Sequence, residues 1–178
     1  PEVGDIRLVP VPTEPSESQL LLAYTDPKGR YELQHAREWQ LAGRTTDEHL
    51  VLRLMDRGEF VAQATLSPWK TTEPGKHLTG DEFREIIAQT PDWQLEKLLE
   101  AEEVKAPTNG NWIYRVAAEG VMDGVAALQY FYLVAGPGGE QLLVAFTMTP
   151  TQAQKLGTRD LALLRGIAFP AAATSERK

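Results

Sequence analysis

The residue types that carry out most enzyme chemistry are scarce and scattered in this sequence. Cysteine is absent, which excludes thiolate nucleophiles, disulfides and cysteine-based metal sites. The three histidines, His35, His49 and His77, stand far apart, whereas a first-row metal ion needs three or four converging donors. Ser67 precedes Pro68 and is not part of a G-x-S-x-G nucleophile turn. We therefore predict no catalytic residue, no metal ion and no cofactor, and we expect the protein not to be an enzyme.

Two groups of carboxylates are dense enough to be considered as sites. One comprises Glu100, Glu102 and Glu103, and the other lies between Asp81 and Glu85. A cation site or a glycosidase pair would require two of these carboxylates to converge in the fold. Runs of this kind usually form a solvated face, so we predict an acidic surface, with a cation site in the first group as the alternative.

Aromatic residues are stronger candidates for a binding surface. Strand alternation predicts one face that carries Trp112, Tyr114, Tyr130 and Tyr132, and an opposite face that carries Phe131 and Leu133. The four-aromatic face either packs into the core or forms an exposed binding surface.

Two further tryptophans, Trp69 and Trp93, lie near predicted loops and are expected to be the more exposed ones. With His77 they outline a cleft that could hold a small molecule or a partner. These three residues are our candidates for ligand or partner binding.

Composition describes an ordinary globular domain of 178 residues, with 42% hydrophobic and 24% charged residues. A net charge of −7 argues against nucleic-acid binding, because phosphates are met by clustered Lys and Arg. No apolar run approaches the length of a membrane span. Because the chain begins with Pro1 rather than Met, we expect it to be a processed or trimmed product.

The order of apolar alternation and turn signals predicts a mainly antiparallel β-structure. The predicted strands comprise residues 19–24, 31–34, 39–42, 49–55, 60–66, 112–119, 125–135, 141–149 and 167–169. Residues 93–104 fit a helix by propensity and a strand by their position beside the later strands.

Two helices are predicted. The first, 80–89, begins at a capping box formed by Thr79 and Glu82 and carries an apolar stripe on one side. The second, 150–165, begins with Pro150 at its first helical position.

The two ends of the chain have the composition of solvated segments. Residues 1–18 are rich in Pro, Glu and Ser and are predicted to be a flexible linker, in which Ile6, Leu8 and Val9 could add a short edge strand. Residues 171–178 are predicted to be a disordered tail, which leaves 19–170 as a single domain.

The segment from Tyr24 to Leu33, with its Thr-Asp-Pro-Lys-Gly-Arg-Tyr core, followed by Trp39, resembles the start of the PsbP-like superfamily. That superfamily includes photosystem II accessory proteins, Ran-release factors and many bacterial extracytoplasmic proteins, and the sequence is most similar to its bacterial branch. The family's proline before the tryptophan is absent here. The resemblance implies an α+β fold, an α/β/α sandwich with a central antiparallel sheet of six to seven strands and helices on both faces. It also favours a strand at 93–104.

Three functions remain open. The resemblance and the missing catalytic groups favour a non-catalytic accessory domain that binds another protein or a cell-envelope component, outside the cytoplasm. The alternatives are a small-molecule or cation-binding protein that uses the cleft near Trp69, His77 and Trp93, and a purely structural domain of a longer chain.

Overall fold

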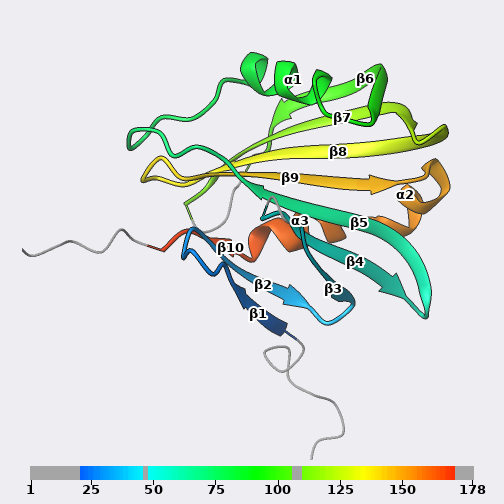
Figure 1. The fold of residues 1–178 in the computed structure, drawn as a ribbon, viewed down its shortest axis with the longest axis horizontal. Coiled ribbons are helices and arrows are strands. Elements are labelled where there is room, and N and C mark those ends of the chain that lie inside the picture. Colours follow the sequence, from blue (N-terminus) through cyan, green and yellow to red (C-terminus); the bar gives the residue numbers. More distant parts are fainter. Residues whose placement is uncertain (1–20, 46–47, 106–109, 171–178) are drawn as a thin grey trace, which may run out of the picture.

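The computed structural model describes residues 21–45, 48–105 and 110–170. Its strands form a seven-stranded sheet in the order β3-β4-β5-β9-β8-β7-β6 and a three-stranded sheet in the order β1-β2-β10, with antiparallel pairing throughout (Figure 1). The strands are β1 (Leu21–Thr25), β2 (Glu32–Ala36), β3 (Trp39–Arg44), β4 (Leu50–Asp56), β5 (Glu59–Pro68), β6 (Trp93–Glu103), β7 (Trp112–Met122), β8 (Val125–Ala135), β9 (Gln141–Met148) and β10 (Ile167–Ala168). The helices are α1 (Gly80–Ala88), α2 (Pro150–Leu156) and α3 (Arg159–Arg165).

This architecture confirms the predicted α+β class, with a central antiparallel sheet and helices on both faces. Residues 93–104 form strand β6 rather than a helix, as the resemblance favoured. The first two predicted strands leave the large sheet and pair with each other and with β10. The predicted linker with its short edge strand at Ile6, Leu8 and Val9, and the predicted tail at 171–178, lie outside the described residues.

The two faces of the large sheet are covered unequally. On one face, here called the α3 face, α2, α3 and the small sheet pack over buried side chains such as Trp39, Leu52 and Phe146. On the opposite α1 face, α1 inserts Phe83 and Ile87 above strands β6 to β8. Both helical layers are apolar on their inner side, so the sheet is the shared centre of two cores.

The predicted helix at 150–165 is two helices, which corrects the single helix expected. Gly157 has φ 59°, a left-handed conformation that ends α2 and that glycine adopts at little cost. The start of α2 is as predicted, since Thr149 caps it ahead of Pro150. The capping box of Thr79 and Glu82 at α1 is also confirmed.

The prediction that four aromatic residues share one face is wrong. A two-residue turn at Asp123-Gly124, both with positive φ, pairs Met122 with Val125 and therefore places Tyr114 opposite Leu133. Trp112 and Tyr114 accordingly share the α1 face with Phe131 and Leu133, whereas Tyr130 and Tyr132 lie on the α3 face. A register that differs by one residue moves a whole strand's side chains to the other face.

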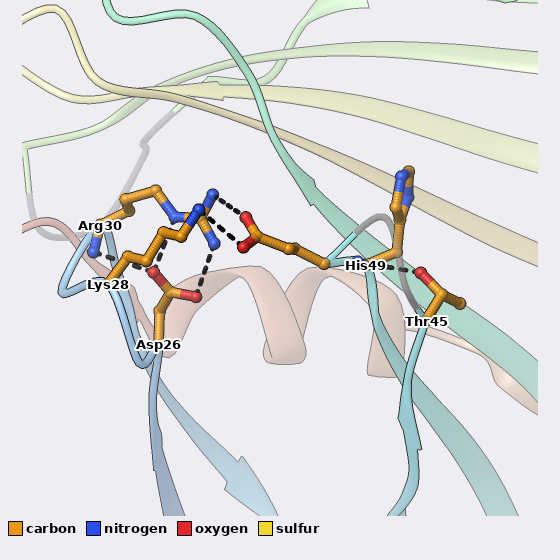
Figure 2. A network of polar contacts seen from close by, with 6 residues as sticks. Asp26, Lys28, Arg30, Thr45 and His49 are labelled. Atoms are coloured by element: carbon orange, nitrogen blue, oxygen red, sulfur yellow. Dashed lines mark hydrogen bonds and ion pairs between the residues drawn. The ribbon is translucent and has the colours of Figure 1, made fainter.

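A network of ion pairs, buried only at Asp26, joins the small sheet to the segment before β4 of the large sheet. The Asp26 side chain, in the β1–β2 turn, accepts from Arg30 Nε at 2.7 Å and from Nη2 at 2.9 Å (Figure 2). Arg30 also donates to Glu48, just before β4, and Lys28 pairs with that same carboxylate at 2.7 Å. The hydrogen bonds from Arg30 hold the pKa of Asp26 below its usual value.

We expect Asp26→Asn to lower the free energy of unfolding by about 2 kcal/mol at pH 7, because it breaks charge-assisted hydrogen bonds at a site 2% exposed. Since the pKa is depressed in the folded state, the carboxylate's contribution is present above the unfolded pKa of about 3.9 and is lost as pH falls through the folded pKa. In urea denaturation at several pH values, the free energy of unfolding should therefore fall less on acidification in the variant than in the unmodified protein.

The matched control is Asp123→Asn, which removes an exposed carboxylate from a turn where asparagine accepts the positive φ. Equal losses of stability in the two variants would contradict a role for the Asp26 ion pair.

Candidate functional site

A cleft of about 610 Å3 lies on the α1 face, between α1 and the strands that α1 leaves uncovered. Its floor is formed by β5, β9 and β8, whose register aligns side chains in rows across the sheet. Successive rows are Gln63–Thr147–Gln129, Thr65–Ala145–Phe131 and Ser67–Leu143–Leu133. The volume is within the range of small-molecule binding sites.

The cleft exists because α1 is too short and too far to one side to cover the whole face. On β5 the side chains toward the α3 face, Ala64 and Leu66 among them, are fully buried. The alternate side chains Gln63, Thr65 and Ser67 are only half-buried. Hydroxyl and amide groups at these positions can face water or a ligand without a desolvation cost.

Gln129 gives one end of the cleft a specific polar group. Its side chain is 2% exposed, and its Nε2 has no hydrogen-bond acceptor among the described residues. A buried donor without a partner costs about 1–3 kcal/mol, and most such groups in native proteins are satisfied. An acceptor supplied by a ligand in the cleft would remove this cost.

The other end of the cleft carries Trp69, which is 37% exposed, and a hydrogen bond of 2.6 Å between Ser67 Oγ and His49 Nδ1. The His49 backbone is held by Thr45 Oγ1 at 3.2 Å (Figure 2). A serine nucleophile needs a group that orients the imidazole, and among the described residues Ser67 is the hydrogen-bond partner that we find for the His49 ring. Among the described residues the pair therefore has no third member of a triad, although it can position a ligand.

Sequence reasoning missed this Ser–His pair, although a signal was present. The two residues are 18 positions apart, at the ends of the predicted hairpin 49–55 and 60–66. Pairing of Leu50 with Leu66 brings the next residues, His49 and Ser67, side by side.

The structure separates the three predicted site residues. Trp69 lines the cleft, whereas His77 stacks on Trp112 with ring centroids 3.7 Å apart and donates to the carbonyl of Leu78. Trp93 is only 5% exposed, so its predicted exposure is wrong. Its indole packs over Gly120, where an added Cβ would lie 2.6 Å from the ring. Trp93 and His77 therefore contribute to packing beside α1 rather than to the cleft.

A second cavity, of about 480 Å3, lies on the α3 face between β6 and α3, and Glu102 and Glu103 line it. Arg115 occupies its wall, paired with Glu100 and 4.6 Å above the ring centre of Tyr130. Within the described ranges no three His, Asp or Glu side chains gather as a metal site. The cation of Arg115 in the middle of the acidic group disfavours a second cation there.

Behind that cavity a hydrogen-bonded chain fastens α3 to the sheet. Arg115 Nε donates to Tyr132 Oη at 3.0 Å, and the Tyr132 hydroxyl donates to Asp160 Oδ2 at 2.5 Å. Burial and then the charge of Asp160 raise the pKa of Tyr132, so the hydroxyl stays protonated and keeps donating. Arg115, Tyr132 and Asp160 are all hydrogen-bonded to one another in series, so we interpret this network as a structural support for α3.

We expect Gln129→Met to raise the free energy of unfolding by about 1 kcal/mol, because it removes the unpaired amide and keeps the side-chain length. Urea denaturation of the two proteins at neutral pH measures the difference. A clear loss of stability in the variant would mean that the amide is satisfied within the fold.

Comparisons of the sequence alone match no family model and no curated protein. Solved structures do match. The cyanobacterial PsbP protein CyanoP from Synechocystis sp. is 16% identical, with 84% of this chain and 92% of that chain covered and a TM-score of 0.57. LpqN of Mycobacterium tuberculosis, described as involved in cell envelope biogenesis, is 10% identical over 84% of this chain and 91% of its own, with a TM-score of 0.50. A protein from Pseudomonas aeruginosa described as a putative regulator is 13% identical, with 86% of this chain and 99% of that chain covered and a TM-score of 0.51.

These likenesses show a common architecture, and the chain has a PsbP-like fold. At such identities they carry no residue roles from one protein to another. Among the described residues, none of the helices is long and apolar enough to cross a membrane.

Proposed function

We propose that this protein is a non-catalytic binding domain that holds an apolar or amphipathic ligand in the cleft beneath α1. The observation that carries the proposal is the buried, unpaired amide of Gln129 in a cleft of about 610 Å3 with a mainly apolar lining. Such a combination of apolar walls with a few placed polar groups is typical of ligand sites. Trp69 is the one residue of the predicted site that takes part.

An accessory role outside the cytoplasm is part of the proposal. Support comes from the likeness of fold to LpqN, a protein described as involved in cell envelope biogenesis. Envelope components with apolar chains have the chemistry that this cleft would accept.

Filling the cleft should abolish binding. Ala145 lies in the middle row of the floor, and Ala145→Trp places an indole where the ligand would lie. We expect the full chain to enhance Nile red fluorescence saturably and Ala145→Trp to lose that signal, as measured by dye titration. Ala23→Trp, at an exposed position of β1, is the control and should bind like the unmodified protein.

Circular dichroism of Ala145→Trp separates a filled cleft from an unfolded chain, and Thr65→Trp in the same row gives a second test. Unchanged dye binding in both folded variants would refute the proposal. Hydrolysis of p-nitrophenyl butyrate that disappears in Ser67→Ala would show that the domain is catalytic after all.

Strand β6 supports a second candidate function, the binding of a protein segment. It is an eleven-residue edge strand of the large sheet, and its Leu95, Leu98 and Leu99 are 39–42% exposed. Edge strands of this kind pair with an added strand. Four glutamates and one lysine on β6 make a partner strand rich in Lys and Arg the complementary one.

A photo-crosslinking residue in place of Leu98, expressed in the native host, should capture one defined protein through a basic segment. The same residue in place of Leu41, exposed on the opposite edge strand β3, is the control. Identical products from the two positions, or none from position 98, would exclude this edge as the docking site.

A further inference from the structure

A line of polar side chains crosses five adjacent strands on the α1 face. The register aligns Gln40, Arg53, Gln63, Thr147 and Gln129 on β3, β4, β5, β9 and β8. Directly opposed side chains in antiparallel strands lie about 5 Å apart, so the line is continuous. We call these five residues the polar row; its last three members line the cleft, and the other two extend it onto the open part of the face.

Two members of the polar row are donors that lack an acceptor. Gln129 Nε2 is buried without a partner, and Arg53, exposed on β4, has no ion pair or hydrogen bond among the described residues. Between them lie the amide of Gln63 and the hydroxyl of Thr147, each of which can either donate or accept a hydrogen bond. The row therefore offers donors to an acceptor-rich group, which would replace water at the exposed Arg53 and satisfy the buried Gln129.

The electrostatic surroundings favour an anion at this end of the cleft. The chain has 25 Asp and Glu residues, yet none of the described ones lines the cleft. The end of α1 is close by, but its carbonyls at Glu85, Ile86 and Ile87 already accept from the amides of Gln89 and Thr90. Arg53 is thus the nearest full charge along the row, and it is positive.

The rest of the cleft is apolar and elongated. From the polar row to the row of Ser67 is four residues of extended strand, about 13 Å, which is roughly the length of a ten-carbon chain. Phe131 and Ala145 form the floor of this stretch, Ile86 and Ile87 of α1 form its wall, and Trp69 stands at the far end.

We infer that the ligand of the cleft is a single-chain amphiphile with an acidic head, bound with its head on the polar row and its chain beneath α1. The inference rests on the proposed function and specifies its ligand. Gln129 donates to the head inside the cleft, and the apolar floor and wall bury the chain. Arg53 lies three strands from Gln129, about 15 Å along the row, so it attracts the charge of the head from the rim of the cleft rather than sharing the contact of Gln129. The positive charge of Arg53 favours a negatively charged head, whereas Gln129 can donate a hydrogen bond to any head that offers an acceptor.

Decanoate and decanol test this inference, because they differ in the charge of the head. We expect calorimetric titration of the full chain at pH 8 to give about tenfold tighter binding of decanoate than of decanol. Arg53→Gln should abolish that preference and leave decanol binding unchanged. Arg44→Gln removes an exposed arginine of β3 that lies on the other face, because the register shift between Leu41 and Gly43 pairs it with Leu50, and this change should preserve the preference.

Gln129→Met should lower the affinity for both decanoate and decanol about threefold or more, although the protein becomes more stable. Added salt should reduce the preference for decanoate in the unmodified protein and not in Arg53→Gln. Weaker binding in a more stable variant, or a salt effect that depends on Arg53, would distinguish a head-group contact from a general loss of structure.

Equal affinity for the two probes, or equal effects of Arg53→Gln and Arg44→Gln, would overturn the inference. Failure of both probes to displace Nile red would also overturn it, while the cleft would remain a binding site. If Nile red itself does not bind, the proposed function fails with it.

Discussion

The pairing of Met122 with Val125 across the turn at Asp123-Gly124 fixes which side of the large sheet each central side chain occupies. The turn needs positive φ at both positions, and these residue types accept it. From that register follows the division of the β7 and β8 side chains between the two cores, and the pairing of β8 with β9 and of β9 with β5 sets the rows that form the cleft floor. A one-residue difference would move Phe131 away from α1 and Tyr132 away from Asp160.

Unequal covering of the sheet leaves a cleft on the α1 face, which is the proposed binding site. The α3 face is closed by two helices and a small sheet, which leaves residues such as Leu52 and Phe146 fully buried. On the α1 face a helix of nine residues covers the strands on one side only. On the uncovered strands, β5 carries Gln63, Thr65 and Ser67 in alternation and β4 carries Arg53, so the open face is compatible with water and with a ligand.

Some buried polar side chains in this molecule are hydrogen-bonded within the fold, and one has an unpaired donor. Asp26 is enclosed by Arg30, and Asp160 accepts from Tyr132, so both carboxylates are matched within the fold. Gln129 is buried to the same degree, and its Nε2 lacks such a match. The contrast separates groups that hold elements together from one that keeps an unpaired donor beside the cleft.

The sequence by itself determined the local features: the capping box at Thr79, the helix start at Thr149 and Pro150, the hairpin turns and the alternation along each strand all act within a few residues. It also indicated the fold, through the segment between Tyr24 and Leu33. Only the tertiary structure decided the cross-strand register and the lateral position of α1. These depend on pairings between distant segments, which is why Trp93 was placed at the surface and the Gln63–Thr147–Gln129 row was not foreseen. The aromatic face was misassigned for a different reason: the two-residue turn at Asp123-Gly124 fixes the β7–β8 register locally, and the prediction did not carry the alternation through that turn. Of the three residues selected in advance, Trp69 lines the cleft, whereas Trp93, selected for the same reason, is buried, and a glutamine within a strand gives no such signal in the sequence.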